Sequence, residues 1–118
     1  MQTPLPSLIL LIACAPQAEL ACAELCYVAE PLQEQCLLDE GLTWAQSRWG
    51  SAEDFAASCQ TWIWTQRRLA RSAHSPLRRE GDRTLAQACT SQVEQLTAEP
   101  TCTSYRSIDW NEPLWEAH

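Results

Sequence analysis

The clearest pattern of hydrophobic and polar positions lies between Ser51 and Ala73, and it predicts one long amphipathic helix. Side chains at the spacing of one helical face include Phe55, Cys59, Trp62, Ile63, Gln66, Leu69 and Ala70. Ser51 suits the N-cap, because its hydroxyl can accept a hydrogen bond from the backbone N–H of Asp54. Trp64 falls on the opposite face, and we expect it to pack against a second layer of structure.

Shorter stretches of helical periodicity lie on both sides of this segment. We expect helices over Glu19–Glu30, Pro31–Glu40 and Thr84–Ala98, with Pro31 interrupting the first two. A polar loop is predicted over Ser72–Asp82, which contains Pro76 and Gly81. The stretch from 41 to 50 reads either as a short helix capped by Thr43 or as a loop.

The residues after Pro100 alternate imperfectly between polar and apolar side chains. We expect them to form an extended tail that packs on the helices, with a short strand over 105–110 as one form of it. The fold class that follows is mostly α: a small disulfide-linked bundle of about four helices with an extended, tryptophan-containing C-terminal tail. Only three glycines occur in the 118 residues, which argues against a turn-rich β-sandwich.

The chain has seven cysteines, and six of them fall within the predicted domain. We expect Cys22, Cys26, Cys36, Cys59, Cys89 and Cys102 to form three disulfides. A bond between the first two is disfavoured, because side chains four residues apart on a helix lie parallel and too far from each other. The favoured arrangement joins these two cysteines to Cys59 and Cys89, in either order, and leaves Cys36 with Cys102.

The seventh cysteine follows a short apolar run, Leu8–Ala13, that is too short to span a bilayer and fits the apolar part of a secretory signal. The four residues Leu11-Ile12-Ala13-Cys14 resemble the lipobox of bacterial lipoproteins. This resemblance implies a signal peptide over 1–13, a lipid on Cys14, a short tether over 14–19 and one domain over 20–118. An ordinary secreted protein, cleaved after Ala15 or Ala23, and a cytosolic protein are the alternatives.

The lipobox resemblance also indicates a compartment. It implies a membrane as partner, through the lipid on Cys14, and a place in the bacterial cell envelope. Because Ala15 follows the cysteine, similarity to enteric lipoproteins favours the outer membrane over the inner one; a secreted or periplasmic protein is the alternative. The chain resembles short lipoproteins rich in Cys and Trp whose function is unknown, so the resemblance implies no activity.

The charge is uneven along the chain. The net charge is −7 and all eight basic residues are arginine, which argues against nucleic acid as a partner. Six arginines gather within 17 residues: Arg67, Arg68, Arg71, Arg78, Arg79 and Arg83. They form either a solvated helix end and loop, or a contact surface for anionic lipid, lipopolysaccharide phosphate or an acidic protein.

Tryptophan provides the second set of candidate binding residues. Trp44, Trp49, Trp110 and Trp115 lie outside the strongest helical patterns. They either cover the helical core or form a surface on which a sugar ring or another apolar molecule stacks. An envelope protein or a glycan would then be the partner.

Catalytic motifs are missing from the sequence, and we predict no catalytic residues, metal site or cofactor. The two histidines, His74 and His118, lie in a polar loop and at the last position. There is no Cys-x2-Cys pair of the kind that binds zinc or carries redox chemistry. The expected role is therefore structural or binding rather than enzymatic. A small secreted hydrolase, or an inhibitor of one, is the alternative.

Overall fold

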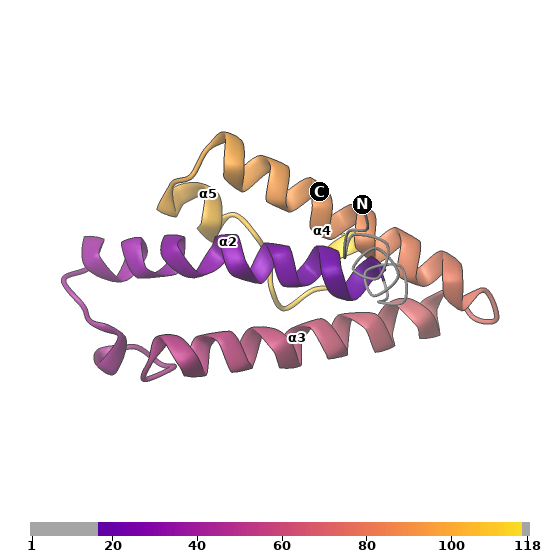
Figure 1. Ribbon diagram of the computed structural model, residues 1–118, viewed down its shortest axis with the longest axis horizontal. Coiled ribbons are helices and arrows are strands. Elements are labelled where there is room, and N and C mark those ends of the chain that lie inside the picture. Colours follow the sequence, from indigo (N-terminus) through magenta and orange to yellow (C-terminus); the bar gives the residue numbers. More distant parts are fainter. Residues whose placement is uncertain (1–16, 117–118) are drawn as a thin grey trace, which may run out of the picture.

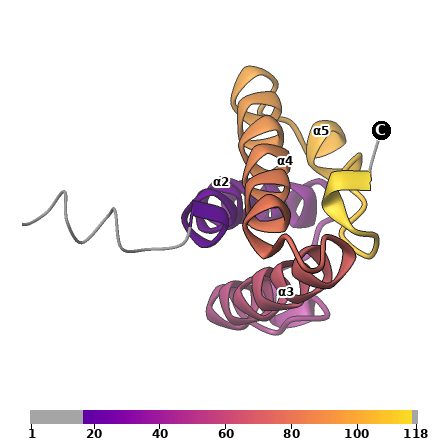
Figure 2. The ribbon, with the colours of Figure 1, turned by 90° about the vertical axis from the view of Figure 1, so that its right-hand side faces the viewer.

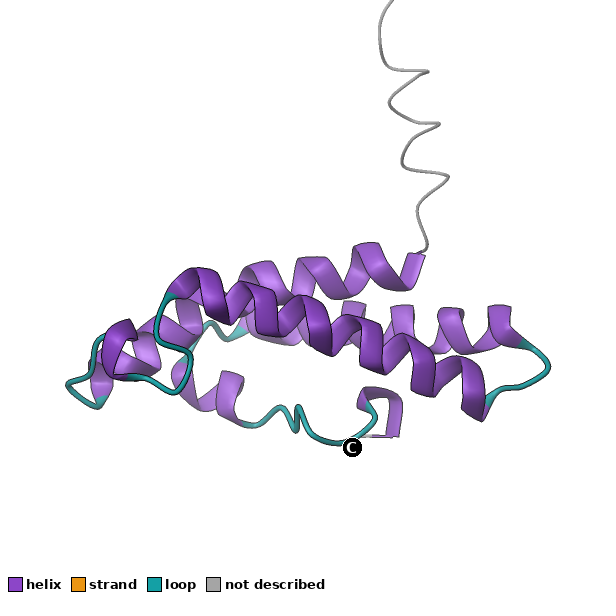
Figure 3. Cartoon of the chain, turned by 90° about the horizontal axis from the view of Figure 1, so that it is seen from below, coloured by secondary structure: helices purple, strands orange, loops and turns teal. Residues whose placement is uncertain are grey.

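The computed structural model describes residues 17–116, in which helices and loops alternate and no strand occurs (Figures 1 and 3). The long helices are α2 (Gln17–Asp39), α3 (Ala52–Ala73) and α4 (Arg78–Ala98). Shorter elements are η1 (Trp44–Gln46), α5 (Cys102–Arg106) and η2 (Leu114–Glu116). Helix α2 lies between α3 and α4 in Figure 1, and Figure 2 shows α5 and the tail on the side of α4 away from the start of α2. None of the described helices is long and apolar enough to cross a membrane.

Helix α2 runs without interruption through Pro31, so the prediction of two helices was wrong. Proline lacks the N–H that would bond to the preceding turn, and this local loss normally ends or kinks a helix. Here Pro31 faces solvent, while the buried side chains continue from Leu25 through Ala29 to Leu32. This unbroken apolar face favours one helix over two. The helix also begins at Gln17, so residues 17–19 of the expected tether are helical.

Helix α3 has the predicted extent. Its N-cap is Ser51, whose hydroxyl accepts a hydrogen bond from the Asp54 backbone N–H at 3.0 Å. Phe55, Ile63 and Ala70 are buried on the face that the spacing indicated. Leu69 is exposed, and Trp64 keeps 57% of its surface accessible, so the expected second layer over Trp64 is absent from the described part of the chain.

Helix α4 begins six residues before its predicted start, because Gly81 and Asp82 make contacts with α3 that favour a helix there. Gly81 is buried, and a Cβ atom on it would lie 2.5 Å from the carbonyl oxygen of Ala70. Glycine is a poor helix former, yet only glycine permits this close approach of two backbones. Asp82 accepts two hydrogen bonds from Arg71, at 3.3 and 3.1 Å. The loop between α3 and α4 is therefore only four residues long, 74–77.

Three disulfides join the helices in the arrangement that the sequence favoured. Cys22–Cys89 links α2 to α4, Cys26–Cys59 links α2 to α3, and Cys36–Cys102 links α2 to α5. All three begin on α2, which is therefore covalently fixed to each of the other helices. The core around it includes Leu25, Ile63, Leu85 and Leu96, each at most 1% exposed.

The C-terminal tail packs on the bundle as expected. Its first residues form α5 rather than the short strand considered over 105–110, because Thr101 caps a helix there by accepting a hydrogen bond from the Ser104 backbone N–H. The buried side chain of Gln66 fixes the end of the tail: its Oε1 accepts from the Leu114 N–H at 2.9 Å, and its Nε2 donates to the Glu112 carbonyl. The tail therefore lies along α3.

Candidate functional site

A cavity of about 380 Å³ lies between the first half of α3 and the C-terminal tail. Its lining combines aromatic rings with polar groups at the rim. The aromatic residues are Trp49, Phe55, Trp62, Tyr105 and Trp110; the polar ones include Arg48, Ser58, Arg106, Asp109 and Asn111. We call this the aromatic cavity. Such a mixture of apolar walls and a few polar groups is typical of a small-molecule binding site.

The loop before α3 places Trp49 at this cavity. Gly50 has a φ of 88°, a conformation that favours glycine, and it turns the chain into the N-cap of α3. The rings of Trp44 and Trp49 both pack against Phe55, with centroids 5.5 and 5.0 Å from it. Trp44 Nε1 donates a hydrogen bond to Glu34 of α2 at 2.9 Å. Trp44 thus supports the loop from behind and does not line the cavity.

Trp62 and Trp110 form the opposite wall. Their ring centroids lie 4.9 Å apart with an edge-to-face angle of 72°, and Trp62 Nε1 donates to the Trp110 carbonyl at 2.9 Å. These contacts fix the tail against α3. The indole Nε1 of Trp110 is buried and has no hydrogen-bond partner within residues 17–116. A buried donor without an acceptor is costly, so this wall retains an unsatisfied polar group.

Tyr105 closes one side of the cavity from α5. Burial raises the pKa of Tyr105 to about 12, and the positive charge of Arg48 opposes this rise. The phenol therefore keeps its proton, and with it a hydrogen-bond donor, to a higher pH than an exposed tyrosine does. Arg48 itself lies over the face of Trp49, with its guanidinium carbon 4.6 Å from the ring centroid. The cavity is thus bordered by neutral and cationic donors together with the carboxylate of Asp109.

The four tryptophans predicted as binding residues do not lie at one site in the structure. Trp49 and Trp110 line the aromatic cavity, whereas Trp44 packs behind it and Trp115 lies near His74, with ring centroids 6.4 Å apart. The sequence interpretation missed Trp62 and Tyr105. Trp62 was assigned to the core because its spacing fits the buried face of α3, and that face is the one that borders the cavity.

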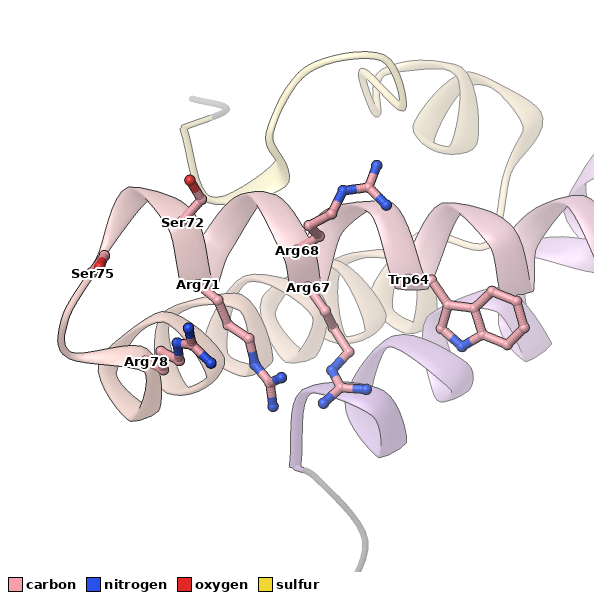
Figure 4. A pocket seen from close by; sticks show the side chains of 7 residues that line it. All are labelled: Trp64, Arg67, Arg68, Arg71, Ser72, Ser75 and Arg78. Atoms are coloured by element: carbon pink, nitrogen blue, oxygen red, sulfur yellow. The ribbon is translucent and has the colours of Figure 1, made fainter.

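Four of the six clustered arginines line a second candidate surface (Figure 4). A cavity of about 570 Å³ is lined by four of them, Arg67, Arg68, Arg71 and Arg78, together with Trp64, Ser72 and Ser75. No carboxylate lines it. We call this the arginine face. In Figure 4, Trp64, Arg67 and Arg71 point toward the side where α2 begins, while Arg68 points to the other side, toward the tail.

Two of these arginines also serve the fold. Arg67 Nη1 lies 3.1 Å from Glu19 Oε2 in the first turn of α2, and Arg71 pairs with Asp82. Of the two arginines outside the cavity, Arg83 pairs with Glu80 at 3.3 Å. Arg68, Arg78 and Arg79 are exposed and form no ion pair within the described residues. Arg79, on α4, does not line the cavity.

The histidines offer no catalytic arrangement that the structure describes. His74 ends α3, and its Nδ1 lies 2.8 Å from the Ala70 carbonyl oxygen, which assigns this nitrogen as a donor. His118, Cys14 and the predicted signal peptide lie outside the described residues. Between Gln17 and Glu116, no group of three or more His, Cys, Asp or Glu side chains is placed to hold a metal ion.

Comparisons with protein-family models, with curated proteins and with solved structures found no match for this chain. The two cavities and the disulfide framework therefore carry the functional argument.

Proposed function

We propose that this chain is a binding module of the bacterial cell envelope, anchored by a lipid on Cys14, and that it holds a glycan in the aromatic cavity. The observation that carries the proposal is the composition of that cavity. Three tryptophans and a tyrosine from segments far apart in the sequence meet there, with Asp109, Asn111 and Arg106 beside them.

A glycan fits this combination better than a purely apolar ligand. The C–H faces of a sugar ring pack against indole rings, while its hydroxyls need donors and acceptors beside those rings. Asp109, Asn111 and Arg106 supply both kinds of group. An apolar ligand would cover these polar groups without replacing their hydrogen bonds to water, which costs free energy.

The proposed compartment rests on the cysteines. Disulfides persist in oxidising compartments such as the periplasm and the cell surface. The three disulfides use all six cysteines of the described domain, so Cys14 has no disulfide partner left within the chain. A lone cysteine at the end of a lipobox-like segment is the position where lipid modification would occur. The role that we propose is structural or binding, and it is a proposal that rests on the cavity and on the cysteines.

Titration calorimetry with soluble oligosaccharides tests the ligand. The protein is the full chain with Cys14→Ser, and the probes are N-acetylglucosamine oligomers and lipopolysaccharide core oligosaccharide. We expect Asp109→Ala to weaken binding about tenfold, since a hydrogen bond to a charged group contributes about 1.5 kcal/mol or more. Trp49→Ala should weaken it at least as much, and Trp115→Phe should leave it unchanged. A fatty-acid probe that binds while every oligosaccharide fails would refute the glycan assignment.

The mass of the mature protein from an envelope-competent bacterial host tests the anchor. We expect a chain that begins at Cys14 and carries diacylglyceryl and acyl groups, and we expect Cys14→Ser to release the domain from the membrane fraction. An unprocessed chain that begins at Met1 would refute the lipid anchor. The glycan proposal would not be affected, because calorimetry tests it separately.

A further inference from the structure

We propose that the arginine face lies against an anionic membrane surface and binds the phosphates of lipid headgroups there. The inference rests on the proposed lipid at Cys14 for the position of the domain, and on the charge of Arg71 and Arg78 and the exposure of Trp64 for the contact itself.

The first step is distance. Only two residues separate Cys14 from Gln17, the first residue of α2, and three extended steps span at most about 11 Å. The ion pair between Glu19 and Arg67 then holds the first turn of α2 against α3, with 3.1 Å between Oε2 and Nη1. The arginine face thus adjoins the place where the chain would enter the lipid. Charges so close to a membrane lie within roughly one Debye length of its surface, about 8–10 Å at physiological salt.

The second step is charge. Four arginines line this cavity, and Glu19 and Asp82 pair with two of them, so the face keeps a positive charge although the whole chain carries a net charge of −7. An anionic surface therefore repels most of the domain and attracts this face, which selects one orientation. Arg78 is exposed and forms no ion pair within residues 17–116, so its guanidinium group retains donors that phosphate oxygens can accept.

The third step is the apolar component. Trp64 points to the same side of α3 as Arg67 and Arg71 (Figure 4). It is 57% exposed, and Leu20, in the first turn of α2, is 45% exposed. Tryptophan is enriched at the headgroup level of membranes, where its ring meets the apolar region and its N–H stays hydrated. An exposed tryptophan beside arginine is therefore typical of a surface that contacts lipid headgroups.

Vesicle binding tests the inference with the full chain carrying Cys14→Ser, which removes the lipid and isolates the contribution of the protein surface. Sedimentation is measured with vesicles of phosphatidylglycerol and, separately, of phosphatidylcholine, at low salt. We expect binding to the anionic vesicles that falls as salt rises. The double variant Arg71→Gln/Arg78→Gln should bind about 5- to 25-fold more weakly, from the contribution of each arginine near such a surface. Its matched control, Arg48→Gln/Arg106→Gln, removes the same charge beside the aromatic cavity and should change binding less than twofold.

Fluorescence gives an independent measurement on the same samples. We expect the anionic vesicles to shift tryptophan emission to shorter wavelength, and Trp64→Ser to remove most of this shift. Equal binding to both kinds of vesicle, no binding at low salt, or equal losses in the two double variants would overturn the inference. Inorganic phosphate is added as a competitor of vesicle binding. If it displaces the protein from anionic vesicles at a phosphate concentration equal to that of the lipid headgroups, the site binds free anions rather than a membrane surface, and the inference is overturned. The anchor is tested separately by the mass of the mature protein, so either proposal can fail without the other.

Discussion

Gly81 provides a sharp test of how α3 and α4 pack, because two effects of replacing it by alanine have opposite signs. An added Cβ would lie 2.5 Å from the Ala70 carbonyl oxygen and 2.8 Å from its carbon, and neither atom belongs to a flexible side chain. Relieving this overlap requires the two helices to separate by roughly 0.9 Å, and a gap of that size loses about a quarter to a half of the dispersion attraction across it.

The expected size of the effect follows from the two terms. Overpacking in a close contact costs typically about 1–3 kcal/mol, and a backbone contact with no freedom to move belongs near the upper end. The higher helix propensity of alanine offsets about 1 kcal/mol of this cost. We therefore expect Gly81→Ala to lower the free energy of unfolding by about 1–2 kcal/mol, which lowers the Tm of a domain this size by on the order of 10 °C.

The assay is thermal and urea unfolding of the oxidised protein, followed by far-UV circular dichroism. Ser91→Ala, at an exposed position on the same helix, is the matched control and should raise stability by a few tenths of a kcal/mol through propensity alone. A Gly81→Ala variant that gains stability as Ser91→Ala does would refute the reasoning, because it would mean that α3 and α4 do not approach as closely as the structure has them.

Three further variants test other parts of the fold. Replacing Cys22 and Cys89 by alanine opens a loop of 67 residues and should lower the free energy of unfolding by about 4 kcal/mol in urea titrations; a loss below 1 kcal/mol would contradict this. Gln66→Leu leaves the Leu114 N–H without its acceptor, so we expect faster hydrogen exchange at that amide and a loss of about 1–3 kcal/mol. For Tyr105, the folded pKa of about 12 lies above the unfolded value of 10.0, so the unfolded chain loses its proton first and stability falls as pH rises from about 10 to 12. Tyr105→Phe should remove most of this fall, which amounts to roughly 2–3 kcal/mol in pH-dependent unfolding, and since the chain has no lysine, few other groups titrate in that range.

The parts of the fold that sequence analysis predicted correctly are those set by local rules. Ser51 caps α3 because a serine hydroxyl at that position satisfies a free backbone N–H, and no distant contact is needed to recognise it. The disulfide pairing could be favoured because Cys22 and Cys26 are too far apart on one helix to bond with each other. Excluding that bond removes only three of the fifteen possible pairings, so the arrangement expected among the other twelve was a preference, which the structure confirms.

The parts that sequence analysis missed depend on contacts between distant segments. Pro31 and Gly81 both disfavour a helix locally, and each lies inside one because a neighbouring element compensates. Pro31 is tolerated on the exposed side of a helix whose other side is continuously buried. Gly81 is needed where α4 meets the backbone of Ala70. Helix propensity describes single residues, so it includes neither the burial of the other side of α2 nor the contact of Gly81 with α3.

The aromatic cavity could not be predicted as a site for a related reason. Trp62 and Trp110 are far apart in the sequence, and their spacing resembles that of core residues as much as that of a binding surface. Only the hydrogen bond from Trp62 Nε1 to the Trp110 carbonyl, and the path of the tail along α3, bring them to one wall. The arginines were a clearer signal, because their clustering is visible in the sequence itself.

The two candidate surfaces share helix α3 without interfering with each other. Trp62 and Trp64 are two residues apart, so their side chains leave the helix about 200° from each other. One faces the tail and the aromatic cavity, and the other faces the side where α2 begins (Figure 4). If the arginine face rests on a membrane next to the anchor, the aromatic cavity opens on the side of α3 away from the lipid, where a glycan can reach it. Binding of lipid and binding of glycan should then be independent, so anionic vesicles should leave the oligosaccharide affinity unchanged.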